Sequence, residues 1–131
     1  MPVKPTNALA IAAFALTCVW SVATKAEEAR FVVYFEEWSV RLSPDAERMI
    51  ADAAKKAKEL GTPSIRIEGR ASAVGSAKTN KLLAETRTSI VADELQHDGV
   101  AGASIKEIPV GQTGSGDPGV TDRRVDIIVE R

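Results

Sequence analysis

The sequence alternates segments that have the period of β-strands with segments that have the period of amphipathic helices. Apolar residues recur at helical spacing from about Pro44 to Leu60, behind a Ser-Pro-Asp start and ahead of Gly61, and this pattern predicts a helix. A second helix pattern runs through Leu82 and Leu95 and ends at residues 98–99. Four further segments have the composition of strands: residues 31–35, 64–69, 105–110 and 124–130. The predicted order is β-α-β-α-β-β, an α+β fold in which two main helices pack on a mixed sheet in a sandwich.

Length and composition limit the domain count and the chemistry. A chain of 131 residues has room for one domain, since a domain usually takes about 100–150 residues. The 17 Lys and Arg residues nearly balance the 18 Asp and Glu residues, which disfavours nucleic acid and anionic membrane surfaces as partners. The single cysteine, Cys18, and the single histidine, His97, are too few for the usual zinc ligand set or a disulfide framework. We therefore expect one domain with no metal and no cofactor.

The N-terminal segment differs from the rest of the chain in charge. No charged residue lies between Lys4 and Lys25, and an apolar block occupies residues 8–23. A basic residue, an apolar stretch and small residues near Ala23 are typical of a secretory signal peptide with its cleavage site. This interpretation gives a signal peptide at 1–23, a short linker at 24–30, a domain at 31–131 and a periplasmic location.

Two alternatives remain for this segment. It could be retained as an N-terminal anchor, although a spanning helix needs about 20 apolar residues; membrane association would then occur only through the uncleaved segment. It could also carry a lipid on Cys18. Thr17 disfavours the lipoprotein, because the residue before an acylated cysteine is normally Gly, Ala or Ser.

Most candidate catalytic features have simpler explanations. His97 suits the negative end of a helix dipole, and nothing indicates a nucleophile beside it. The glycine-rich residues 111–119 precede a strand and lack the Lys-Ser or Lys-Thr of a phosphate-binding loop. The carboxylate pairs at 27–28 and 36–37 are adjacent in sequence, whereas hydrolytic pairs face each other across a substrate. Trp38 is as consistent with packing as with ligand stacking. We expect no enzyme activity.

One constellation remains, at the turn after the second predicted strand. Residues 68–76 form this turn, and Asn80 and Arg87 follow on the second predicted helix. Seven residues correspond to two helical turns, so these two side chains share a helix face that can look back on the turn. The spacing predicts a polar pocket there.

The chain resembles a known family in the segments FVVYF, LSPDAERMI, IRIEGRASAVGS, NKLLAETR and DRRVDIIV. These are similar to the OmpA-like C-terminal domain, which anchors Gram-negative envelope proteins to peptidoglycan. The resemblance covers about residues 31–129. Its most specific parts are the spacing of Asn80, Leu83 and Arg87 and the ending at residues 122–127. It implies the OmpA-like fold and a non-enzymatic module that binds peptidoglycan non-covalently in the periplasm, associated with the outer membrane or the cell wall.

The resemblance also implies roles for individual residues. In the family an aspartate binds the ammonium of the diaminopimelate stem, and a helix arginine, here Arg87, binds its carboxylate. The family motif Gly-His-Thr-Asp aligns with residues 69–72, which places Arg70 at the histidine and Ser72 at the aspartate. A hydrogen bond to a charged group contributes about 1.5–3 kcal/mol. Loss of the aspartate that binds the ammonium therefore predicts about ten- to hundredfold weaker binding. The replacement of this aspartate by Ser72, beside Arg70 and Arg87, also predicts a locally basic pocket.

Two hypotheses for the function follow. In the first, the domain binds peptidoglycan, either fully or in a weakened form, with Arg87 as carboxylate clamp, Asn80 as pocket support and Glu37 in place of the missing acid. In the alternative, a divergent OmpA-like protein-interaction domain has lost peptidoglycan binding. It then uses Arg70, Arg87 and the Ser72 turn for an anionic group on an envelope protein.

Overall fold

The computed structural model describes residues 2–3, 27–61, 63–112 and 122–131. The predicted leader and its cleavage site fall almost wholly on residues 1 and 4–26, outside the described residues, as does most of the glycine-rich segment 111–119. Among the helices of the described ranges, none combines the length and the hydropathy that a membrane span requires.

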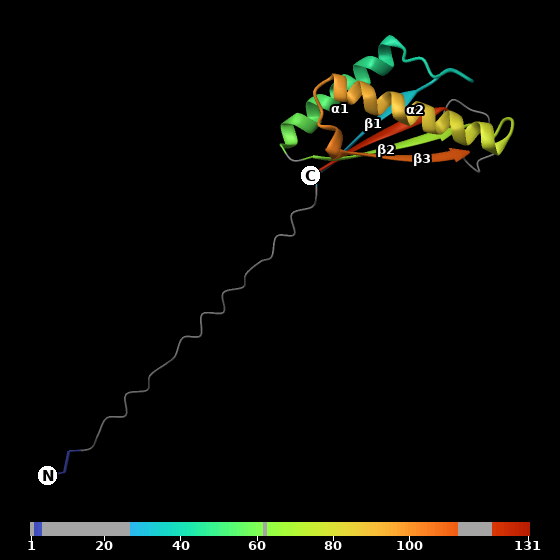
Figure 1. The fold of residues 1–131 in the computed structure, drawn as a ribbon. Coiled ribbons are helices and arrows are strands. Elements are labelled where there is room, and N and C mark those ends of the chain that lie inside the picture. Colours follow the sequence, from blue (N-terminus) through green and yellow to red (C-terminus); the bar gives the residue numbers. More distant parts are fainter. Residues whose placement is uncertain (1, 4–26, 62, 113–121) are drawn as a thin grey trace.

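The elements follow the predicted order (Figure 1). They are β1 (Glu28–Tyr34), α1 (Pro44–Leu60), β2 (Ser64–Ala71), α2 (Ala77–His97), the short 3-10 helix η1 (Gly102–Ser104), β3 (Ile105–Gln112) and β4 (Arg124–Glu130). The helix η1 was not predicted. Strand β1 begins at Glu28, inside the segment expected to be a linker, and β2 and β3 each continue past the predicted end.

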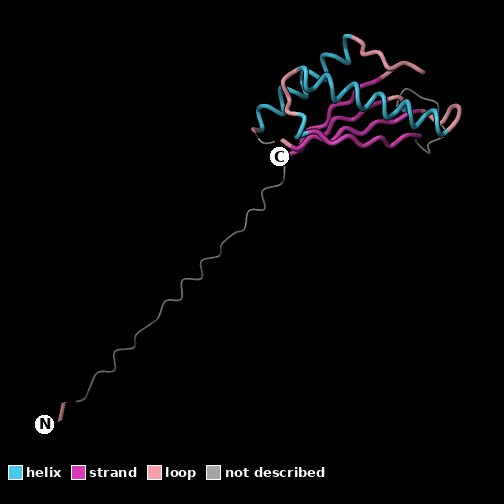
Figure 2. The backbone as a smooth tube through the Cα atoms, in the orientation of Figure 1, coloured by secondary structure: helices cyan, strands magenta, loops and turns pink. Residues whose placement is uncertain are grey.

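The strands form one mixed sheet with the order β1-β4-β2-β3. Strand β4 is antiparallel to both of its neighbours, and β2 is parallel to β3. Both helices lie on the same side of the sheet (Figure 2), and their apolar residues share one core cluster with those of the strands. The predicted α+β class and mixed sheet are confirmed.

Serine caps fix where both helices begin. The Ser43 hydroxyl accepts a hydrogen bond from the Ala46 amide at 3.1 Å, and Pro44 is the first residue of α1. The Ser76 hydroxyl accepts in the same way from the Thr79 amide at 3.1 Å. Such caps satisfy amides that have no partner within the helix. The second cap starts α2 directly after the connection that follows β2, and this brings the N-terminal end of α2 close to the candidate site.

The two faces of the sheet differ in character. On the helix side Ile65, Ile67 and Ile127 are fully buried in the core. On the other side, charged residues of β2 and β4 alternate with them, among them Glu68 and the buried Asp126. Because side chains alternate along a strand, the face of each β2 residue is determined by its distance from the core isoleucines.

Gly69 allows α2 to approach β2 closely. A Cβ atom at this position would lie 2.6 Å from the carbonyl oxygen of Ala84 and would also collide with the Thr88 hydroxyl. Any larger residue would therefore push the helix away from the sheet. This close approach places the middle of α2, including Arg87, against the ends of β1 and β2.

Candidate functional site

Arg87 lies at the centre of the candidate site and is completely buried. Its Nε atom donates to the Ser39 carbonyl at 3.0 Å and its Nη2 atom to the Glu36 carbonyl at 2.9 Å. Its Nη1 atom makes a longer contact of 3.5 Å with the Arg70 carbonyl. The guanidinium also lies 5.0 Å from the centre of the Phe35 ring, within the range of a cation-π contact. One arginine thus holds together the β1–α1 connection, β2 and α2.

No carboxylate pairs with this guanidinium in the part of the chain that the structure describes. Burial, and to a smaller extent repulsion by Arg123, lowers the pKa of Arg87 to about 10. The side chain is therefore still a cation at neutral pH, stabilised by carbonyl dipoles and by the Phe35 ring. Its donors bind the protein's own backbone carbonyls, so Arg87 positions the first turn. Direct contact with a ligand carboxylate would require these carbonyls to move.

The connection that Arg87 holds is a tight turn at residues 36–39, called here the first turn. The Ser39 amide donates to the Glu36 carbonyl at 3.1 Å and closes it. Trp38 has a φ of 57°, which is the left-handed region. The side chains of Glu36 and Glu37 are exposed, and no hydrogen bond or ion pair within the described ranges engages their carboxylates. The first turn therefore presents two free acids and an indole.

The second turn comprises residues 72–76 and lies against the first. A Cβ atom on Gly75 would be 2.9 Å from Cη2 of Trp38, so the indole packs directly on this glycine. The side-chain amide of Asn80 donates to the Val74 carbonyl at 2.9 Å. Ser72 and Asn80 are both buried. The structure therefore confirms that α2 looks back on this turn, and it brings the two turns together at Trp38 and Gly75.

Arg70 does not join this group. Its Nη1 atom pairs with Asp126, and its Nη2 atom lies 3.2 Å from the Glu68 carboxylate, on the sheet face away from the helices. Asp126 also contacts Arg30 at 3.3 Å and Arg124 at 3.2 Å. The expected basic pocket of two arginines beside Ser72 is therefore wrong. Strand alternation points the Arg70 side chain away from the helices, and only its carbonyl reaches the site.

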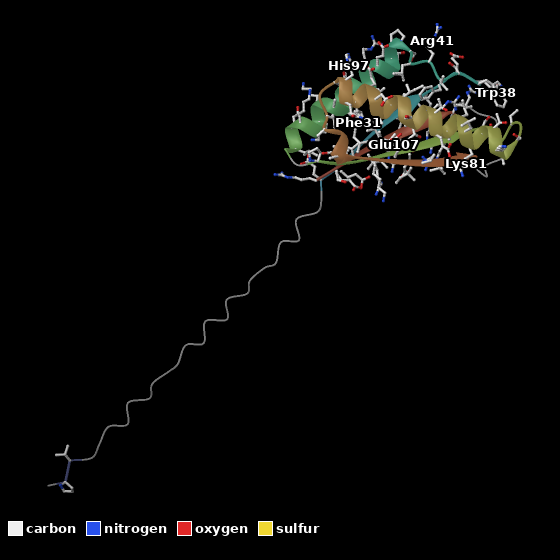
Figure 3. The ribbon with its side chains drawn as sticks, in the orientation of Figure 1. Phe31, Trp38, Arg41, Lys81, His97 and Glu107 are labelled. Carbon is white, nitrogen blue, oxygen red and sulfur yellow. The ribbon has the colours of Figure 1, made fainter. Side chains whose placement is uncertain are left out.

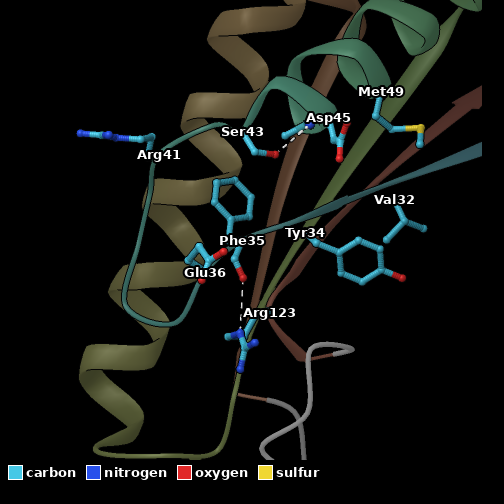
Figure 4. A pocket seen from close by; sticks show the side chains of 10 residues that line it. Val32, Tyr34, Phe35, Glu36, Arg41, Ser43, Asp45, Met49 and Arg123 are labelled. Carbon is cyan, nitrogen blue, oxygen red and sulfur yellow. Dashed lines mark hydrogen bonds between the residues drawn. The ribbon is translucent and has the colours of Figure 1, made fainter.

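A hollow of about 340 Å³ lies beside the first turn (Figure 4). The aromatic ring of Phe35 lies among its lining side chains, and Arg123 donates from Nε to the Phe35 carbonyl at 3.3 Å. The Arg41 side chain extends away from the others. The remaining lining residues are Val32, Tyr34, Glu36, Ser43, Asp45, Ala46 and Met49. No spacing in the sequence joins these residues, although Arg123 belongs to the motif at residues 122–127.

The described residues contain no group of three or more His, Cys, Asp or Glu side chains that could hold a metal ion. His97 is exposed at the end of α2, far along that helix from the two turns (Figure 3). Glu37 is placed beside Trp38 at the tip of the first turn, which is compatible with the role expected for it.

Comparison with known proteins agrees with this architecture. The OmpA family matches residues 34–125, whereas no curated protein sequence matches. The fold is similar to the peptidoglycan-associated lipoprotein of Burkholderia pseudomallei, with a TM-score of 0.69 and 22% identity over 76% of this chain and 89% of that one. It is similar to the OmpA-like domain of FopA1 from Francisella tularensis, with a TM-score of 0.69 and 20% identity over 84% and 77%.

The periplasmic domain of Helicobacter pylori MotB gives a TM-score of 0.66 and 19% identity over 82% of this chain and 77% of that one. At these identities the likeness shows the shared fold. The family match covers most of the chain and includes both turns and α2, which carry the site. The domain is accordingly a non-enzymatic module of the OmpA type. The chain belongs to the OmpA family.

Proposed function

We propose that this chain is an exported cell-envelope module that binds peptidoglycan non-covalently where the first and second turns meet. The observation that carries the proposal is the buried Arg87, which fixes the first turn through two backbone carbonyls and so aims free carboxylates outward beside the second turn. Family membership and the name of the Burkholderia relative, a peptidoglycan-associated lipoprotein, support the choice of ligand.

The charges of the site suit the diaminopimelate end of the stem, which carries an ammonium and a carboxylate. Glu37, and Glu36 beside it, offer unpaired acids to the ammonium in place of the aspartate that Ser72 replaces. The Arg87 cation beneath the turn supplies positive potential for the carboxylate without contacting it, because charges act further through a low-dielectric interior than through water. Arg87 does not contact the ligand, and glutamates of the first turn replace the family aspartate. For both reasons we expect a weaker affinity than the family motif would give.

The residues 1–23 act in this proposal as a removable leader that delivers the domain to the periplasm. The alternative function, recognition of an anionic group on an envelope protein, depended on a free Arg70. Its guanidinium is paired with Asp126 and Glu68, so the structure offers that alternative less support.

Sedimentation of the purified full chain with diaminopimelate-type sacculi tests the proposal. Wild type is expected in the pellet, and Glu37→Gln is expected to bind about tenfold more weakly, since one charge-assisted contact is lost. Glu107→Gln, an exposed acid on β3 away from the turns, is the matched control and should leave binding unchanged.

The variant Ser72→Asp restores the acid of the family motif and should strengthen binding about tenfold or more. Thermal unfolding of each variant verifies that the fold is intact. The proposal is contradicted if neither wild type nor Ser72→Asp sediments with sacculi, or if Glu37→Gln and Glu107→Gln behave alike.

A further inference from the structure

Trp38 is held in a conformation that its own residue type disfavours. It is the one residue other than glycine with a positive φ among those that the structure describes. For a bulky side chain the left-handed region is costly, and such residues persist only where their surroundings impose the conformation. At this position the surroundings are known: Arg87 binds the Glu36 and Ser39 carbonyls on either side of Trp38.

The conformation leaves the indole in solvent. Trp38 is 50% exposed, and the atoms that pack on Gly75 are Cη2, Cζ2 and Cζ3, all on the benzene ring of the indole. Gly75 itself has a φ of 90°, so both contacting residues are in the left-handed region. Trp38, labelled in Figure 3, lies at the end of the domain remote from the C-terminus marked in Figure 1. The fold thus fixes an exposed aromatic side chain at some energetic cost and buries only part of it.

The surroundings of the indole combine apolar surface with hydrogen-bond acceptors. Val74, which precedes the contacted glycine, is also partly exposed, at 40%. The free carboxylates of Glu36 and Glu37 belong to the same turn as Trp38. At the base of the second turn the buried Oδ1 atom of Asn80 has no hydrogen-bond partner in the described part of the chain, which is uncommon for a buried polar atom.

We infer that Trp38 is a stacking platform for a sugar ring of the glycan strand. This inference rests on the proposed function and adds the glycan to the stem as a recognised part of the ligand. One face of a pyranose ring consists of C–H bonds and packs on an aromatic face, while its hydroxyl and acetamide groups donate hydrogen bonds. A flat apolar side chain with carboxylate acceptors beside it matches both parts of that chemistry.

Two soluble ligands separate glycan recognition from stem recognition. One is a muropeptide with its disaccharide and diaminopimelate stem, and the other is the same stem peptide without sugar. The full chain carries Trp20→Phe, so that Trp38 is the only tryptophan and reports binding through its fluorescence. We expect the muropeptide to bind about two- to tenfold more tightly than the stem, the range of one aromatic contact, and to shift the Trp38 emission.

Trp38→Ala, measured by calorimetry, should remove the preference for the muropeptide and leave the affinity for the stem unchanged. Trp38→Phe retains an aromatic ring and should keep most of the preference. This variant therefore distinguishes loss of the ring from disruption of the first turn. Leu82→Ala is the control, since Leu82 is an exposed apolar residue (63%) that does not line the hollow beside the first turn.

Equal affinities of wild type for the two ligands would overturn the inference alone. Equal losses for both ligands in Trp38→Ala would also overturn it, because they would indicate a purely structural role. If neither ligand binds wild type, the proposed function fails and the inference fails with it.

Discussion

Replacing Arg87 by methionine tests whether this residue holds the first turn. The substitution keeps an unbranched apolar chain but removes every donor, so the Glu36 and Ser39 carbonyls lose contacts of 2.9 and 3.0 Å. A hydrogen bond to a charged group contributes about 1.5–3 kcal/mol. Two effects offset part of the stabilisation that is lost with these hydrogen bonds. The variant no longer buries a charge, and water can reach the two carbonyls. We therefore expect the free energy of unfolding to fall by about 3 kcal/mol.

Chemical and thermal denaturation measure this loss. For a domain of this size 1 kcal/mol corresponds to about 4–8 °C, so the melting temperature should fall by about 12–24 °C. In the Trp20→Phe background, Trp38 fluorescence should also report a loosened turn before global unfolding. Arg48→Met is the control, because Arg48 is an exposed α1 residue whose ion pair with Asp45 contributes little. An Arg87→Met protein within about 0.5 kcal/mol of wild type, the range of ordinary surface substitutions, would refute the reasoning.

Three further predictions address the scaffold of the site. Gly69→Ala should lower the free energy of unfolding by about 1–3 kcal/mol, since its Cβ would meet the Ala84 carbonyl oxygen at 2.6 Å; unchanged stability in urea would argue against the close helix approach. Asp126→Asn should lower the free energy of unfolding by about 3 kcal/mol, because it removes a buried carboxylate that three arginines share. A change below about 0.5 kcal/mol would show that this carboxylate does not stabilise the fold. The hydrogen bond from Lys56 lowers the pKa of Glu27 below 4.5, so the stabilisation from this pair is present at neutral pH and is lost as the pH falls through that lowered pKa. Titration followed by NMR should show the pKa of Glu27 rising in Lys56→Gln, and an unchanged value would contradict the pairing.

Local patterns in the sequence predicted the helices and the core strands because each of these carries its own periodicity. The start of α1 at Pro44 and the whole of β4 agree with the structure. Both have strong local signals: a cap in one case, and apolar residues at alternate positions (Val125, Ile127 and Val129) in the other. The beginning of β1 at Glu28 was missed. Its first residues are polar and pair with the far end of β4, and such a long-range pairing leaves no trace in the local pattern.

The site was predictable to the extent that it depends on helix periodicity. Asn80 and Arg87 face the interior of the domain as their spacing predicted. The partners of Arg87 are backbone carbonyls, which have no signature in the sequence, so its structural role could not be predicted. The error on Arg70 was avoidable. Continuing the alternation of Ile65 and Ile67 past Gly69 would have pointed Arg70 away from the helices, but the strand was predicted to end at that glycine.

The conformation of Trp38 could not be predicted either. A tryptophan after an apolar strand suits packing as well as stacking, and no local rule places it at a positive φ. The conformation follows from two carbonyls meeting a buried arginine that is distant in sequence. Functional sites often depend on such contacts, because they fix side chains that local propensity would leave variable.

Chemical-shift mapping tests the central claim most directly. The full chain, labelled with nitrogen-15, is titrated with a muropeptide that carries a diaminopimelate stem. The account predicts that the largest shifts fall on residues 36–39 and 72–80 and on the indole of Trp38, with little change around Asp126 on the opposite sheet face. Absence of shifts at saturating muropeptide, or shifts concentrated around Asp126, would contradict the account.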